Sequence, residues 1–269
     1  MPEHFPGDDI SPIEPRSSRE PLPPDEVFGI TANMEDEPEI ARPRWTVGAT
    51  LPVIGFLLVL ALPGLFSQHG PDEPPVNVPA LLAVQTLFYG MLLGYIFMVV
   101  RLRHGLPLLD GLQWRHGEPA RRVNFLVGGL FLAVGVQLLQ FLFPIQAELP
   151  IERLFHNRQA ALLLAGFGIV IAPFVEEVIF RGFIFPAVEN QWGLSAAVWS
   201  TAALFALIHV PQLRGGVPQM VVIFVVGLVL SWARGRYRSL LPPYLLHLGY
   251  NTALFAMLYA STRGFRHFE

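Results

Sequence analysis

The chain has 269 residues, of which 52% are hydrophobic and only 14% are charged. Soluble domains usually carry charged side chains at about a quarter of their positions, so this composition argues against a soluble globular protein and favours a membrane protein. The formal net charge of -3 is an average over two unlike parts, because the residues after 45 hold fourteen Arg against ten acidic residues, and nothing in either part resembles a nucleic-acid-binding surface. The absence of cysteine excludes disulfides and thiolate metal sites.

The first 45 residues differ from the rest of the chain in composition. They contain eleven acidic residues, four Arg and nine Pro, with few large apolar side chains. Such a segment cannot bury enough apolar surface to fold, and it has no apolar stretch of the kind found in a signal peptide. We therefore expect residues 1–45 to form a disordered, acidic, Pro-rich tail.

Apolar segments follow one another through the remainder of the chain, and the longer ones match the roughly 20 residues needed to cross a bilayer. The sequence predicts an all-α, polytopic transmembrane helix bundle of about seven spans. Residues 46–143 would form the N-terminal transmembrane helices, and 150–155 an interfacial amphipathic piece or an ordinary turn. The expected spans are residues 46–66, 79–100, 123–143, 159–186, 196–210, 220–232 and 245–260.

The placement of arginine predicts the orientation of the bundle. Arg residues gather before the first span and in the loops expected after the second and sixth spans, which alternate crossing puts on one side of the membrane. The positive-inside rule makes that side cytoplasmic, so the N-terminus is expected in the cytoplasm. The residues concerned are Arg42, Arg44, Arg101, Arg103, Arg115, Arg121, Arg122, Arg234, Arg236 and Arg238.

Ionisable groups inside apolar helices are the most informative feature of the sequence. A central charge costs roughly 2.5–3.5 kcal/mol on insertion scales, so such residues face protein or water. Glu177 and Arg181 stand at i and i+4 and can form an ion pair, whereas Glu176 lies about 100° around the helix and has no local partner. Pro173 could kink this helix. All three charged residues could equally form one structural cluster.

Two further polar sites interrupt later spans. Phe205 and His209 share a helix face, as do His247 and Asn251, and Gly249 would allow a close helix approach. Taken alone, each site is more often a satisfied core histidine or an interhelical hydrogen bond. Taken together, they are compatible with one site, because Glu176 and His209 would each lie roughly 22 Å from a turn at 191–193. His247 fits less well, at about 12 Å of helix from its own turn.

A carboxylate and an imidazole that share a water molecule can activate it for attack on a carbonyl. Glu176 is the candidate general base, and His209 would hold the same water. His247 and Asn251 could donate hydrogen bonds to the developing oxyanion. Glu177 and Arg181 would fix the helix, and Phe205 could pack beside the His209 imidazole. We expect no cofactor, although two His and a Glu could also bind zinc; the HExxH spacing of zinc proteases is absent.

Three motifs resemble those of a known family. EEVIFRG at 176–182, FALIHVP at 205–211 and HLGYN at 247–251 are similar to the EExxxR, FxxxH and HxxxN/B motifs of the CPBP family. This family contains the CAAX prenyl endopeptidases and their bacterial, abortive-infection-type relatives. The resemblance covers about residues 150–260. It implies a helical membrane fold with a hydrated site, in which Glu176 and His209 activate water and His247 and Asn251 form the oxyanion hole.

The leading hypothesis is therefore an intramembrane endopeptidase that acts on a lipid-anchored or membrane-embedded peptide, in contact with membrane lipids. A bacterial cytoplasmic membrane is the expected location. One alternative is a non-catalytic membrane adaptor or bacteriocin-immunity-type protein on the same scaffold. Another is a transporter with a Glu/His proton relay. The sequence does not identify the substrate.

Overall fold

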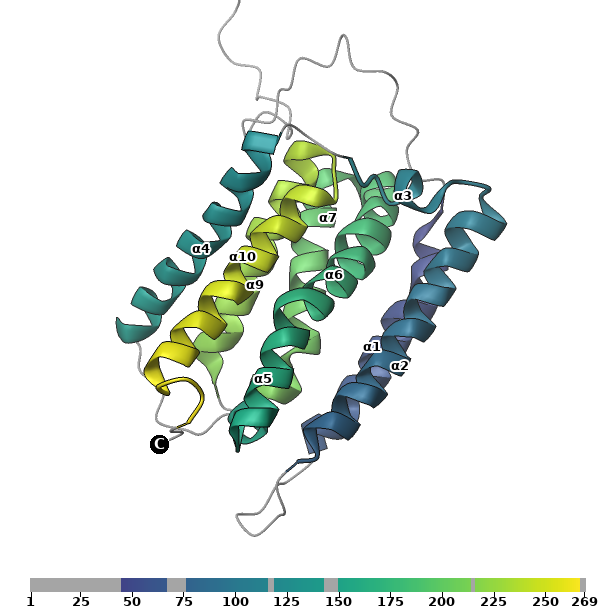
Figure 1. The fold of residues 1–269 in the computed structure, drawn as a ribbon. Helices are drawn as coiled ribbons and strands as arrows, with labels where there is room; N and C mark the ends of the chain where they lie inside the picture. The colour runs from purple at the N-terminus through teal and green to yellow at the C-terminus, as the bar shows by residue number, and fades with distance from the viewer. Residues whose placement is uncertain (1–44, 67–75, 116–118, 143–149, 214–215, 267–269) are drawn as a thin grey trace, which may run out of the picture. The chain divides into compact units, whose positions relative to one another are not determined.

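The computed structural model describes residues 45–66, 76–115, 119–142, 150–213 and 216–266, and Figure 1 draws the fold. Helices make up the ordered elements, and no strand occurs within these ranges. The prediction of an all-helical fold is confirmed. The expected disordered tail lies outside the described residues except for Trp45, whose side chain is only 1% exposed.

The first two long helices are α1 (Val47–Phe66) and α2 (Val78–Phe97). The side chain of Asn77 accepts a hydrogen bond from the backbone N–H of Ala80 at 3.1 Å, which caps the start of α2. At its other end α2 continues as a π-helix, η1 (Met98–Arg103), which carries Arg101 and Arg103. These two Arg residues were expected in a loop, but the structure places them in the last helical turns.

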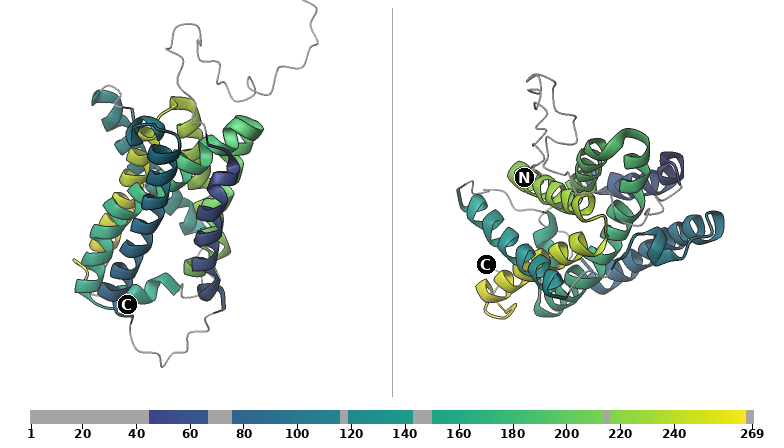
Figure 2. Two further views of the ribbon diagram at one scale, coloured as in Figure 1. Left: turned by 90° about the vertical axis from the view of Figure 1, so that its right-hand side faces the viewer. Right: turned by 90° about the horizontal axis from the view of Figure 1, so that it is seen from above.

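The helices α4 (Pro119–Leu142) and α10 (Leu241–Ser261) run side by side, as Figure 1 and the view from above in Figure 2 show. Glycine makes this contact close. A Cβ atom added at Gly249 would lie 2.1 Å from the carbonyl oxygen of Leu126, and one added at Gly129 would lie 2.1 Å from that of Leu246. The two backbones therefore touch, as the sequence predicted for Gly249.

A long helical run forms the centre of the fold. It consists of α5 (Arg158–Gly166), η3 (Phe167–Ile171), α6 (Ala172–Glu177), η4 (Val178–Ile184) and α7 (Phe185–Ile208). The run folds back at Gly193, whose φ of 83° and ψ of 172° are not helical. Phe180 and Phe205 lie at similar distances along the chain from Gly193, and their rings meet at 5.3 Å. The turn expected at 191–193 is present.

Two parts of this run, η3 and η4, are π-helices, and side chains from distant parts of the chain bind three of their carbonyl groups. Trp45 Nε1 donates to the carbonyl of Phe183 at 2.8 Å, and Arg234 Nε donates to that of Arg181 at 2.9 Å. In η3 the Gly168 carbonyl accepts from Asn251 at 2.7 Å. π-Helical turns are rare and often occur at functional sites. Here donors from distant segments help to hold this backbone.

The remaining elements are α3 (Leu108–Gly111), η2 (Pro150–Phe155), α8 (Val210–Leu213) and α9 (Val217–Tyr237). The short segment at 150–155 is a 3-10 helix. Arg234 corrects the sequence analysis, because it lies within α9 rather than in the following loop and is only 1% exposed. Its Nη2 atom donates to the side-chain oxygen of Gln113, so the guanidinium is hydrogen-bonded inside the protein.

Four helical runs in the described residues are long and apolar enough to cross a membrane. The seven-span count stays a prediction. One reason for the difference is that the fourth and fifth expected spans lie in a single run that bends at Gly193; another is that the apolar part of α1 is short. The four runs are Val78–Arg103, Arg121–Leu138, Arg158–Ile208 and Val217–Tyr237.

Candidate active site

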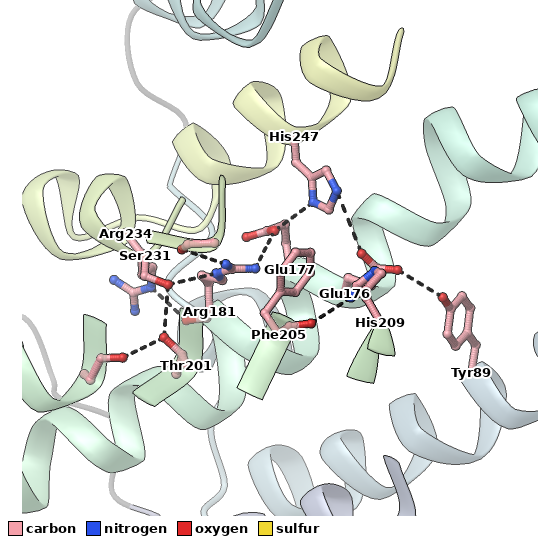
Figure 3. A network of polar contacts seen from close by, with 12 residues as sticks. Tyr89, Glu176, Glu177, Arg181, Thr201, Phe205, His209, Ser231, Arg234 and His247 are labelled. Atoms are coloured by element: carbon pink, nitrogen blue, oxygen red, sulfur yellow. Dashed lines mark hydrogen bonds and ion pairs between the residues drawn. The ribbon is translucent and has the colours of Figure 1, made fainter. Parts of the chain in front are cut away.

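Glu176 and Glu177 are the last two residues of α6, directly before the π-helix η4. Their environments differ. The Glu177 side chain is fully buried, whereas that of Glu176 is 15% exposed. Adjacent positions on a helix point in different directions, so one glutamate faces the protein interior while the other keeps part of its surface exposed. Figure 3 shows both carboxylates and their partners.

The predicted ion pair between Glu177 and Arg181 is present. Arg181 Nη1 lies 2.9 Å from Glu177 Oε1, and both side chains have no exposed surface. The other two guanidinium nitrogens also have partners in α9: Nε donates to Ser231 Oγ at 3.3 Å and Nη2 to the Gly227 carbonyl at 3.0 Å. Burying two charges is tolerated when they are paired and hydrogen-bonded. The guanidinium of Arg181 meets that condition, whereas Glu177 Oε2 is buried with no hydrogen-bond partner among the described residues.

His247 connects the two glutamates. Its Nδ1 atom lies 2.9 Å from Glu177 Oε1, and its Nε2 atom lies 3.8 Å from Glu176 Oε2. An ionised carboxylate can only accept a hydrogen bond, so Nδ1 must carry the proton in this contact. Glu177 thereby fixes the orientation of the ring and turns Nε2 toward Glu176. The sequence analysis placed His247 closer to its turn than Glu176 and His209 are to theirs, yet its imidazole does reach both glutamates.

Tyr89 of α2 is a neighbour of Glu176 that the sequence analysis did not find. Its hydroxyl donates to Glu176 Oε1 at 3.5 Å, and its ring stacks on Phe167 with centroids 5.8 Å apart. A tyrosine in an apolar helix is ordinary in sequence, and 87 positions separate it from Glu176. No local pattern could therefore have identified it.

Phe205 lies among the charged and imidazole groups. Its ring centroid is 4.7 Å from that of His209 and 5.8 Å from that of His247. The Arg181 guanidinium carbon lies 4.6 Å from the same centroid, within cation–π range. The expected packing of Phe205 beside His209 is present, and the same ring also contacts two other members of the motif set.

His209 ends α7, and its Nδ1 atom lies 2.7 Å from the Phe205 carbonyl. A carbonyl accepts, so this contact places the proton on Nδ1 and leaves the lone pair on Nε2. Within the described part of the chain, no hydrogen bond or ion pair joins His209 directly to Glu176. Phe205 connects His209 to the rest of the set.

Asn251 lies one helical turn beyond His247 on α10. Its Nδ2 atom donates to the Gly168 carbonyl of η3 at 2.7 Å, and no contact with the glutamates or imidazoles appears among the described residues. A primary amide carries two N–H donors, so one remains for another acceptor. The structure thus gives Asn251 a role in holding η3.

A second group of buried polar side chains lies behind the ion pair. Thr201 Oγ1 and Ser231 Oγ are 3.0 Å apart, Ser231 also accepts from Arg181, and Arg234 binds the Arg181 carbonyl. Figure 3 shows these contacts as one connected network. The sequence analysis assigned Arg234 to a loop and therefore did not predict this network. Across the described ranges, no three His, Asp or Glu side chains are grouped so as to hold a metal ion.

Comparison with known proteins gives one match. Residues 158–253 match the family described as type II CAAX prenyl endopeptidase, Rce1-like. No curated protein and no solved structure matches the chain. The matched segment includes the glutamates, both imidazoles and Asn251, but not Tyr89. Residues 158–253 therefore form a domain similar to the Rce1-like type II CAAX prenyl endopeptidases, and the protein is an integral membrane protein that carries a domain of a peptidase family.

Proposed function

We propose that the protein is an intramembrane endopeptidase that hydrolyses a peptide bond with a water molecule activated by Glu176. One observation carries the proposal: His247 is held by Glu177 at 2.9 Å and presents its other nitrogen to Glu176 at 3.8 Å. A base, an imidazole and a group that orients the imidazole are the usual parts of a hydrolytic site. Glu176 is the one of the two adjacent carboxylates that retains exposed surface.

The proposed reaction begins with proton transfer from water to the Glu176 carboxylate. The water oxygen attacks the carbonyl carbon of the scissile bond, and a tetrahedral oxyanion forms. The Glu176 carboxylic acid then gives its proton to the amide nitrogen as the carbon–nitrogen bond breaks. The products are a new C-terminal carboxylate and a new amine. His209, whose Nε2 lone pair is an acceptor in the tautomer described above, would help to hold the attacking water.

His247 and Asn251 are the proposed donors to the oxyanion. When the His247 ring is protonated, both of its nitrogens donate, so Nε2–H can bind the oxyanion while Nδ1–H remains on Glu177. Asn251 has a second amide hydrogen besides the one on the Gly168 carbonyl. In this scheme Glu177 acts on the reaction through His247, which is a more direct role than fixing the helix.

The surface beside the glutamates supports an apolar or lipidated peptide as substrate. Val170, Ile171 and Phe174 precede the glutamates in the same helical run, and 50%, 45% and 39% of their surfaces are exposed. In a membrane protein such a face contacts acyl chains or an apolar ligand. A peptide anchored by a prenyl group would reach the site along this face.

Cleavage of a fluorogenic peptide tests the proposal. The purified protein in detergent is given a CAAX-type peptide with or without a farnesyl group, and the Glu176→Gln variant serves as the inactive control. We expect the native protein to cleave the farnesylated peptide faster and the variant to lose at least about 100-fold in kcat. Equal activity of the variant would refute the role of Glu176. Inhibition by a chelator that is reversed by zinc would identify a metalloprotease instead.

For the orientation, we propose a cytoplasmic location for the Arg-rich end of the bundle, in a bacterial cytoplasmic membrane. The connections after α3 and after α9 meet at this end: the Ser239 hydroxyl contacts the backbone N–H and carbonyl of Arg115 at 3.3 and 3.2 Å. Because the chain has no cysteine, single-cysteine labelling has no background. An impermeant maleimide should label His156→Cys in intact cells and Arg236→Cys only after lysis; the reverse result would invert the topology.

A further inference from the structure

Glu176 receives a contact from outside the segment that matches the peptidase family. The matched segment starts at residue 158, whereas Tyr89 lies in α2. The two carboxylate oxygens of Glu176 have different neighbours: Oε1 accepts from the Tyr89 hydroxyl at 3.5 Å, and Oε2 lies 3.8 Å from His247 Nε2. Tyr89 and His247 therefore approach the same carboxylate through different oxygens, and Figure 3 shows them on its two sides.

The position of Tyr89 is fixed by packing. Its side chain is only 8% exposed, and its ring is nearly parallel to that of Phe167, with an interplanar angle of 15°. Buried Leu92 and Ile96 continue the same helix into the hydrophobic core. The packing of the ring and of the helix thus holds the hydroxyl in place. A hydrogen bond of 3.5 Å is long, but such bonds at active sites often tighten only when the substrate is bound.

We propose that Tyr89 is a positioning residue for Glu176, so that α2 completes a site that the matched domain alone does not contain. The phenol holds Oε1 and sets the plane of the carboxylate, which leaves Oε2 directed at His247 and at the attacking water. A carboxylate without this contact rotates about its terminal bond, and its basic oxygen spends less time in line with the water. The catalytic consequence of this inference rests on the proposed function, whereas the contact between Tyr89 and Glu176 does not.

Tyr89→Phe removes the hydroxyl and keeps the ring that stacks on Phe167. Tyr95→Phe is the matched control, because Tyr95 lies on the same helix, donates its hydroxyl to the Ala49 carbonyl at 2.9 Å and makes no contact with Glu176. We expect Tyr89→Phe to lower kcat by about 10-fold or more, as the loss of a hydrogen bond to a charged group does, while KM stays within about twofold. Tyr95→Phe should leave kcat unchanged.

Infrared spectroscopy gives a second readout that needs no substrate. The carboxylate band of Glu176 is the one lost in Glu176→Gln, and its frequency reports on hydrogen bonding to that carboxylate. Tyr89→Phe should shift this band and Tyr95→Phe should not. If no peptide is cleaved by the native protein but the band shifts, the proposed function fails and the contact stands. If the protein is an active peptidase and Tyr89→Phe leaves either kcat or the band unchanged, Tyr89 does not position Glu176.

Discussion

The Nδ1 atom of His247 lies 2.9 Å from Oε1 of Glu177, although 70 positions separate the two residues in the chain. The same carboxylate oxygen also accepts from Arg181. One buried glutamate thus neutralises an arginine on its own helix and orients a histidine on α10. The ion pair and the candidate active site are therefore parts of one structure, and a change in either should affect both.

The first prediction concerns this buried pair. Glu177→Leu or Arg181→Leu alone leaves an unpaired charge in the interior, which should lower the free energy of unfolding by about 3–5 kcal/mol. The double variant removes both charges, so its loss should be clearly smaller than the sum of the two single losses. Denaturant titration of the purified protein in detergent measures all three. Additive losses would mean that the two side chains stabilise the fold independently.

The second prediction concerns the contact between α4 and α10. Gly249→Ala would place a methyl group 2.1 Å from the Leu126 carbonyl oxygen, so the two helices must move apart. We expect a loss of about 1–3 kcal/mol in the free energy of unfolding, the usual range for overpacking. Gly135→Ala on α4 is the control, because its Cβ would have no neighbour within 4 Å. Alanine has a higher helix propensity than glycine, so Gly135→Ala should leave the free energy of unfolding unchanged or raise it.

The third prediction concerns the π-helix η4. Trp45→Phe keeps an aromatic ring against Phe183 but removes the Nε1–H that binds the Phe183 carbonyl. Leaving this buried carbonyl without its donor should lower the midpoint of thermal unfolding, by an amount that corresponds to about 1–3 kcal/mol. Trp199→Phe is the matched control, since Trp199 is 51% exposed on α7. Equal midpoints for the two variants would show that Trp45 contributes by packing alone.

Much of the fold could be predicted from the sequence because the apolar segments are long and the glycine, charged and polar residues that interrupt them are easy to recognise. The Gly193 turn, the Glu177–Arg181 pair and the shared face of Phe205 and His209 all rest on local spacing, which helical geometry converts directly into contacts. Long, periodic segments are the most predictable elements of a chain. The structure contains these features where they were expected.

The remaining features depend on contacts between segments far apart in the chain. Tyr89 reaches Glu176 from α2, and Arg234 binds the backbone of η4 from inside α9. Neither has a local pattern, and Arg234 was placed in a loop because arginine near a span end normally marks an interface. The π-helical turns were also not foreseen, since the partners of their carbonyl groups come from distant parts of the chain. Tertiary contacts of this kind leave no trace in local spacing.

The last prediction tests whether Glu176 and His247 act as one unit. The kcat/KM for a CAAX-type peptide is measured for the native protein, Glu176→Gln, His247→Gln and the double variant, with products quantified by mass spectrometry. Each single change should lower kcat/KM by at least about 100-fold, and the double variant should be no more than a few-fold slower than the slower single variant. A single variant with native activity, or losses that multiply in the double variant, would contradict a shared catalytic role.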